Sequence, residues 1–220
     1  MVGTSLFAAS KSNGGGHKEG WWETSSKLKE GGFIGGELGL GGADVCVTGY
    51  YCGDGFSPNL NVMGGYQWYF MDEPYFHLGL RLKGHLGYSY YGADLGYYTN
   101  VGSASTHSLQ IGVEPSFIWD VLQYKQHTLG AYISPIGFEI GTYFGSANLY
   151  TGVDTNLTAY TKFIYLVGAG VHYYYNVKHM VFAGYRYRKI FGGYSKTTPN
   201  SRGFIVRPWH SFVVGYAYKF

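Results

Sequence analysis

The sequence predicts an all-β fold, a transmembrane, eight-stranded, antiparallel up-and-down β-barrel. Apolar and polar residues alternate with a period of two in eight segments, which is typical of strands whose two faces meet different surroundings. Charged residues make up only 13% of the 220 residues, whereas aromatic residues make up 20%. Short and long connections alternate between the eight segments, as they do in barrels that cross an outer membrane.

The clearest of these segments covers residues 76–91. Its apolar parity carries Phe76, Leu78, Leu80, Leu82, Leu86, Tyr88 and Tyr90. The opposite parity is basic and carries His77, Arg81, Lys83 and His85. A bilayer outside and a narrow polar lumen inside suit these two faces, and only a closed barrel satisfies every strand's backbone groups in lipid.

The other segments follow the same rule. In chain order the expected strands cover residues 32–40, 59–70, 76–91, 107–120, 128–144, 159–175, 180–189 and 210–220, each 9 to 17 residues long. Besides those of 76–91, the outward residues are Ile34, Leu38 and Leu40; Leu60, Val62, Tyr66, Trp68 and Phe70; Leu109, Ile111, Val113, Phe117 and Trp119; Leu129, Ala131, Ile133, Ile136, Phe138, Ile140 and Thr142; Phe163, Tyr165, Val167, Val171, Tyr173 and Tyr175; Val181, Ala183, Tyr185 and Tyr187; Phe212, Val214, Tyr216, Tyr218 and Phe220.

The fifth segment changes parity at Ser134 and Pro135. Proline has no N–H to give to a strand ladder, so a β-bulge at this point explains the change.

The connections predict how the barrel is oriented. Three are short (71–74, 121–127 and 176–179), and four are long (41–58, 92–106, 145–158 and 192–208). Short turns on the periplasmic side and long extracellular loops put both termini in the periplasm. Aromatic residues would then form two interfacial girdles, with Phe70, Phe76, Trp119, Tyr173, Tyr175, Tyr218 and Phe220 on the periplasmic side and Tyr88, Tyr90, Tyr187 and Trp209 on the outer side.

A soluble β-sandwich is the alternative fold, because it also has alternating strands. It gives no reason for two bands of Tyr and Trp on the apolar face. A net charge of +3 without a basic tract gives no indication of nucleic-acid binding.

The chain divides into three parts. Residues 1–10 are similar to the end of a signal peptide, with Ala8-Ala9-Ser10 as a small-x-small cleavage site, although a frayed N-terminus is an equal alternative. Residues 11–30 are a polar, Gly-rich periplasmic arm, and residues 31–220 are the barrel.

The last strand carries a family resemblance. Phe212, Val214, Tyr216, Tyr218 and Phe220 resemble the C-terminal signal that barrel-assembly machinery reads in Gram-negative bacteria. The eight-strand layout resembles small barrels of the OmpA, OmpX and OmpW type. The Tyr-rich strands and the stretch GGFIGGELGL, followed by a Cys-bearing connection, are most similar to the Helicobacter outer-membrane protein family. The resemblance implies a bacterial outer-membrane protein, monomeric, in contact with lipid and lipopolysaccharide.

Charged residues with inward parity form the candidate site. They are Glu37, Arg81, Lys83, Glu114, Asp120, Glu139, Lys162, Arg186, Arg188 and Lys219. An eight-stranded barrel is just wide enough for its own side chains to fill, so one interpretation is an ion-pair network that plugs the lumen. The other interpretation is a narrow or gated pore that prefers anions, for which the inward glycines leave room.

Two cysteines, Cys46 and Cys52, lie in the first long connection. In an exported chain they predict a disulfide. A zinc site would need more ligands than the nearby Asp44 and Asp54, so we expect no metal and no cofactor.

The predicted role is structural or surface-interacting, including adhesion, with a host or surface ligand at the long loops. A small channel for polar or anionic solutes is the alternative. A lipid A-modifying enzyme is the third hypothesis, and it would need outward Ser and His side chains with an acid to orient the His. No His-x-Ser pair occurs, so the sequence predicts no enzymatic activity.

Overall fold

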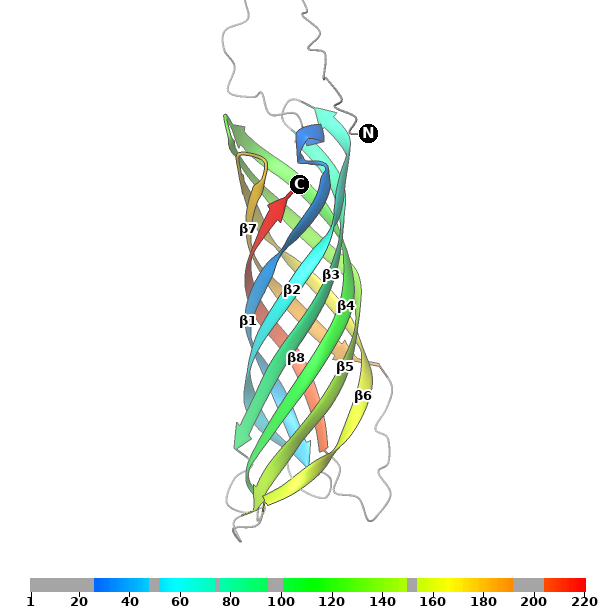
Figure 1. Ribbon diagram of the computed structural model, residues 1–220, viewed down its shortest axis with the longest axis vertical. Coiled ribbons are helices and arrows are strands. Elements are labelled where there is room, and N and C mark those ends of the chain that lie inside the picture. The colour runs from blue at the N-terminus through cyan, green and yellow to red at the C-terminus, as the bar shows by residue number, and fades with distance from the viewer. Residues whose placement is uncertain (1–25, 48–51, 74–75, 95–100, 150–153, 192–203) are drawn as a thin grey trace, which may run out of the picture.

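The computed structural model describes residues 26–47, 52–73, 76–94, 101–149, 154–191 and 204–220. Eight antiparallel strands pair in sequence order, and the last pairs with the first, which closes the barrel (Figure 1). The predicted eight-stranded up-and-down barrel is therefore confirmed. The expected signal-peptide remnant and residues 11–25 of the expected arm lie outside the described residues.

The elements are a 3-10 turn and eight strands, with bounds η1 Ser26–Lys29, β1 Gly31–Val47, β2 Cys52–Glu73, β3 Phe76–Asp94, β4 Val101–Tyr124, β5 His127–Leu149, β6 Asp154–Tyr175, β7 His179–Ile190 and β8 Phe204–Lys219. The C-terminus lies at the same end of the barrel as η1 (Figure 1). There the Phe220 amide donates to the carbonyl of Gly32 at 3.0 Å. We call this end the η1 end, and the other the far end.

The outward face of the barrel is apolar around its circumference. Large side chains such as Leu38, Leu86 and Phe212 are more than 60% exposed. We call this band of exposed apolar side chains the belt. It confirms the predicted outward parity wherever the side chains are described; the Phe76 side chain is not among these.

Most of the residues expected in long loops are strand instead. The strands have 12 to 24 residues, longer than the pattern predicts for most of them. At the far end the connections shrink to 48–51, 95–100 and 150–153, and only 191–203 remains long. The predicted loops 41–58, 92–106 and 145–158 are therefore wrong for most of their residues.

The reason is that the polarity of the two faces inverts beyond the belt. Toward the far end the inward residues become apolar, and they pack into a cluster of Ala43, Val45, Tyr91, Ala93, Ala104, Tyr143, Ala147, Ile164, Leu166 and Val206. The outward residues there are polar, such as Asp94, Ser103 and Asn148, all exposed. A search for outward apolar residues stops at the belt, whereas the backbone ladder continues beyond it with a polar outer face and an apolar inner face.

The expected bulge in β5 is present. The pairing of β5 with β6 shifts register between Ser134 and Gly137, and Pro135 and Ile136 are both exposed. The extra residue restores the outward parity of the apolar side chains that follow.

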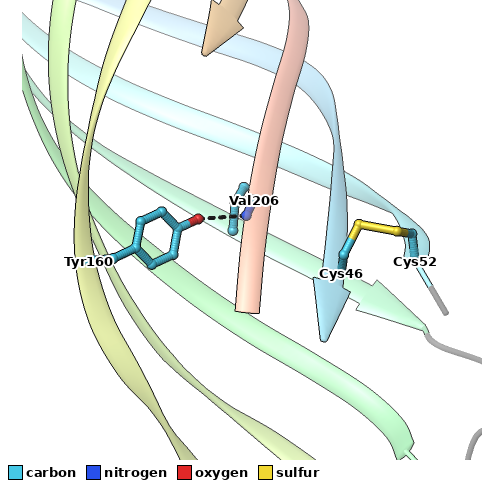
Figure 2. The surroundings of a disulfide bond; sticks show 4 residues. All are labelled: Cys46, Cys52, Tyr160 and Val206. Carbon is cyan, nitrogen blue, oxygen red and sulfur yellow. Dashed lines mark hydrogen bonds between the residues drawn. A yellow bond between two sulfur atoms is a disulfide. The ribbon is translucent and has the colours of Figure 1, made fainter. Parts of the chain in front are cut away.

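β7 is the shortest strand of the eight and leaves its neighbours partly unpaired. It ends at Ile190, so residues 154–163 of β6 and 204–209 of β8 have no β7 partner in the ladder. We call these two stretches the open edges. Just beyond β7, the Phe191 amide still donates to the Phe163 carbonyl at 2.8 Å. Tyr160 of β6 reaches across between them, and its hydroxyl accepts a hydrogen bond from the Val206 amide of β8 at 2.6 Å (Figure 2).

A disulfide joins Cys46 and Cys52 at the tip of the β1–β2 hairpin (Figure 2). The two residues are direct partners in the ladder, with Cα atoms 4.0 Å apart. The predicted disulfide is thus formed between two strands rather than within a loop.

The end of the belt predicts a difference between two positions on the outward face of β4. Val113→Arg places a charge within the belt and should destabilise the protein in lipid vesicles by about 2–4 kcal/mol. Ser103→Arg, beyond the belt, should change the unfolding free energy by less than about 0.5 kcal/mol. Urea unfolding in vesicles measures both, and equal losses would contradict the boundary drawn here.

Candidate functional site

The barrel interior is crossed by an ion-pair network centred on Glu37 of β1. Arg186 of β7 donates to its two carboxylate oxygens at 2.6 and 2.9 Å. Lys83 of β3 lies 3.2 Å away, and Asn61 donates to the same carboxylate at 2.9 Å. Strands from opposite sides of the barrel therefore meet at a single buried carboxylate.

Glu114 of β4 completes this central group. Its Oε2 lies 3.1 Å from the Lys83 ammonium and 3.0 Å from the Arg186 guanidinium. Its Oε1 accepts a hydrogen bond from Ser134 at 2.7 Å. Two carboxylates and two cations thus share one buried site with no net charge, as is required when charges leave water.

A second group lies between β3, β5 and β7. His85 Nε2 is 3.1 Å from Glu139 Oε2, and Arg188 Nε is 3.7 Å from the same oxygen. Arg188 also donates to the Ser211 hydroxyl at 3.0 Å.

A third group closes the η1 end. Asp120 accepts from Lys29 at 2.5 Å, and its other oxygen is 2.7 Å from His172 Nε2. The Lys29 carbonyl accepts from Gln67 at 2.5 Å, and Lys219 donates to the Leu28 carbonyl at 2.7 Å. The turn η1 is therefore held in the barrel mouth by both main-chain and side-chain contacts.

Lys29 is a member of this group that the sequence does not predict. It lies in the polar tract assigned to the arm, where no alternation indicates which side chains point inward. The sequence shows only a lysine close to the first strand, which does not indicate burial. In the structure this lysine is completely buried.

Two inward glycines leave room for side chains of the buried charged groups. A side chain at Gly112 would clash with His85, and one at Gly130 would clash with both His172 and Asp120. Large polar side chains therefore fill the space beside these two glycines.

Nine of the ten charges with predicted inward parity are buried, namely Glu37, Arg81, Lys83, Glu114, Asp120, Glu139, Arg186, Arg188 and Lys219. The tenth, Lys162, is half-buried and takes part in no ion pair with the described residues. Arg81 contacts Gln67 and the Tyr174 hydroxyl instead of a carboxylate.

On the outward face, histidines pair with tyrosines. The ring nitrogens of His107 and His127 each lie 2.5 Å from a hydroxyl, that of Tyr88 and of Tyr173 respectively. His179 and Tyr216 form a similar pair at 2.8 Å. These histidines thus meet phenols, which do not orient a catalytic imidazole as a buried carboxylate does.

Neither metal ligation nor helical membrane insertion is indicated by the described residues. They contain no group of three or more His, Cys, Asp and Glu side chains that could hold a metal ion. They also include no helix long and apolar enough to span a membrane.

Arg186→Met tests whether the central group stabilises the fold. It leaves Glu37 and Glu114 with one cation between them, so the unfolding free energy should fall by roughly 3–5 kcal/mol. Lys162→Met removes an inward-facing cation outside the network and is the matched control, with an expected change within about 0.5 kcal/mol. Urea unfolding in vesicles measures both, and a stable Arg186→Met variant would show that water satisfies these carboxylates.

Comparison with known proteins gives structural similarity only. No family model and no curated protein matches the chain. The chain is similar to the neisserial surface protein A NspA (19% identity, 90% of this chain and 100% of that chain, TM-score 0.44). It is also similar to Ail, the attachment invasion locus protein of Yersinia pestis, in complex with the heparin analogue sucrose octasulfate (14%, 86% and 99%, TM-score 0.39), and to the outer membrane enzyme PagL (15%, 83% and 99%, TM-score 0.39). At these identities and TM-scores, the fold rests on the closed strand pairing itself.

Proposed function

We propose that this protein is a monomeric outer-membrane barrel of a Gram-negative bacterium that presents a rigid β-structure at the cell surface for contact with surface or host ligands. Its termini would lie in the periplasm, and its far end outside the cell. The similarity to the Helicobacter family stays a prediction from sequence.

The observation that carries the proposal is the filled interior. The ion-pair network occupies the middle of the barrel, η1 closes one mouth, and the apolar cluster fills the far end. A conducting pore needs a continuous polar path, whereas these three layers place side chains across the lumen at successive levels.

The belt supports a membrane location. Its exposed apolar side chains run around the whole circumference, whereas soluble monomers usually expose apolar patches of only a few hundred Å². In the last strand, Phe212, Val214, Tyr216, Tyr218 and Phe220 all face outward and are exposed. This arrangement suits lipid contact and is compatible with the proposed role of these residues as an assembly signal.

The far end supports a role in surface contact. The open edges of β6 and β8 carry backbone groups that β7 does not pair, and such edges bind extended segments of other chains. On the same end, Asp44 and Asp54 are direct cross-strand partners. Burial raises the pKa of Asp44, and the hydrogen bond and like charge of Asp54 raise it further. The candidate contact surface therefore combines strand edges that β7 does not pair with acidic side chains.

Single-channel recording in planar bilayers tests the proposal against a channel. The refolded protein should give no stable conductance, because side chains block its lumen. A steady conductance that scales with solute size would instead favour the small-channel alternative. An open porin reconstituted in the same bilayers is the positive control.

Cysteine labelling of intact cells tests the orientation. Asn148→Cys at the far end should react with a membrane-impermeant maleimide, because its side chain is exposed outside the belt. Gln126→Cys, in the turn between β4 and β5, is the matched control and should react only after lysis. The disulfide-bonded native cysteines add no thiol background. The reverse labelling pattern would overturn the proposed orientation.

A further inference from the structure

Arg81 is a buried cation without a carboxylate partner. It is 5% exposed, and no Asp or Glu among the described residues lies within ion-pair distance of its guanidinium. Lys83, Arg186 and Arg188, its cationic neighbours in the interior, each have at least one carboxylate within 4 Å. A buried charge without a counter-charge is costly in free energy. Some other group is therefore expected to offset the charge of Arg81.

The contacts of Arg81 satisfy only part of its guanidinium. Its Nε donates to Gln67 Oε1 at 3.3 Å and its Nη2 to the Tyr174 hydroxyl at 2.9 Å. A guanidinium carries five N–H donors, so most of them have no acceptor in the described part of the chain. The rings of Phe33 and Tyr132 lie 6.0 and 5.9 Å away, which offsets a fraction of the charge but accepts no conventional hydrogen bond.

A small cavity lies next to Arg81. It is lined by Phe33, Met63, Arg81, Lys83, Ser116, Tyr132, Met180 and Phe182, and its free volume is about 10 Å³. This is room for roughly one particle of the size of a water molecule. No carboxylate is among the lining residues, whereas two cations are.

The donors around the cavity are more numerous than the acceptors. The Lys83 ammonium has three N–H groups, two of which are directed to Glu37 and Glu114. The Tyr132 hydroxyl makes no hydrogen bond to the described residues. Ser134 donates to Glu114, so the Ser116 hydroxyl, 2.6 Å away, must donate to Ser134 and offers the cavity only lone pairs.

We propose that this cavity binds one small inorganic anion, a halide such as chloride, between Arg81 and Lys83. The charges of Lys83 and Arg186 are already balanced by Glu37 and Glu114. A bound monovalent anion therefore neutralises Arg81 and gives its remaining donors an acceptor. The apolar walls of Phe33, Phe182 and the two methionines suit a weakly hydrated halide.

The size of the cavity favours a halide over larger anions. A halide is slightly larger than water, and the unbranched side chains of Met63 and Met180 can shift to admit it. Gluconate is far too large to enter. The anion then acts as a structural ligand of the folded barrel.

Diffraction from bromide-grown crystals tests the site directly. Bromide should give an anomalous peak in the cavity between Arg81 and Lys83 of the wild-type protein. Water density without an anomalous signal, or bromide found only elsewhere, would overturn the proposal.

Urea unfolding in vesicles tests the same site in solution. In wild type, each tenfold rise in chloride above its Kd, with gluconate holding ionic strength constant, should raise the folded-to-unfolded ratio about tenfold. Arg81→Met should lose this dependence. Arg188→Met, a buried arginine that does not line the cavity, should be less stable than wild type yet keep the dependence. A chloride dependence that persists in Arg81→Met, or that is absent from wild type, would overturn the proposed anion site. If Arg81→Met fails to fold, the wild-type chloride titration and the bromide peak decide between these outcomes.

Discussion

The closure of β1 onto β8 is the constraint on which the rest of this structure depends. Once the ring of eight strands is closed, backbone groups along the paired stretches are satisfied within the wall. Closure also fixes a narrow interior in which every inward side chain meets side chains from across the barrel. Charged inward residues are then necessarily buried. Each buried charge therefore needs a nearby charge of opposite sign. The contacts of Glu37 with Arg186 and Lys83 meet this need at the centre.

The three interior groups stabilise different levels of the barrel. The central carboxylates tie β1, β3, β4 and β7 together, whereas Asp120 ties β4 to β6 and to η1. Beyond the belt, apolar packing around Tyr91 and Tyr143 holds the strands together instead. The rings of these two residues lie 5.9 Å apart. A single ring of strands therefore uses ion pairs inside where its outer face is apolar, and an apolar core where its outer face is polar.

Much of this fold could be predicted from the sequence, because a period of two is sensitive to which face meets lipid. The strand count, the outward parity and the β5 bulge at Pro135 all follow from it. The extended far end could not be predicted, since the inverted pattern around Tyr91 and Asp94 reads as a loop when only outward apolar residues are counted. Which acid meets which base was equally inaccessible, because the pairing across the lumen depends on the stagger of the strands. Lys29 lacked any periodic signal, and its place in the Asp120 group follows only from the three-dimensional position of η1.

The early end of β7 makes the barrel wall unequal in strength around its circumference. Elsewhere a strand can leave the wall only if two complete ladders break. Beside the open edges a single ladder holds β6 to β5 and β8 to β1. In the described part of the chain, the hydrogen bonds from Val206 to Tyr160 and from Phe191 to Phe163 add to it. Amide hydrogens along 154–163 and 204–209 should therefore exchange with solvent sooner than those of the fully paired strands. Under mechanical force or on heating, the strands would separate first at the open edges. The ion-pair network in the middle of the barrel would still be intact at that stage.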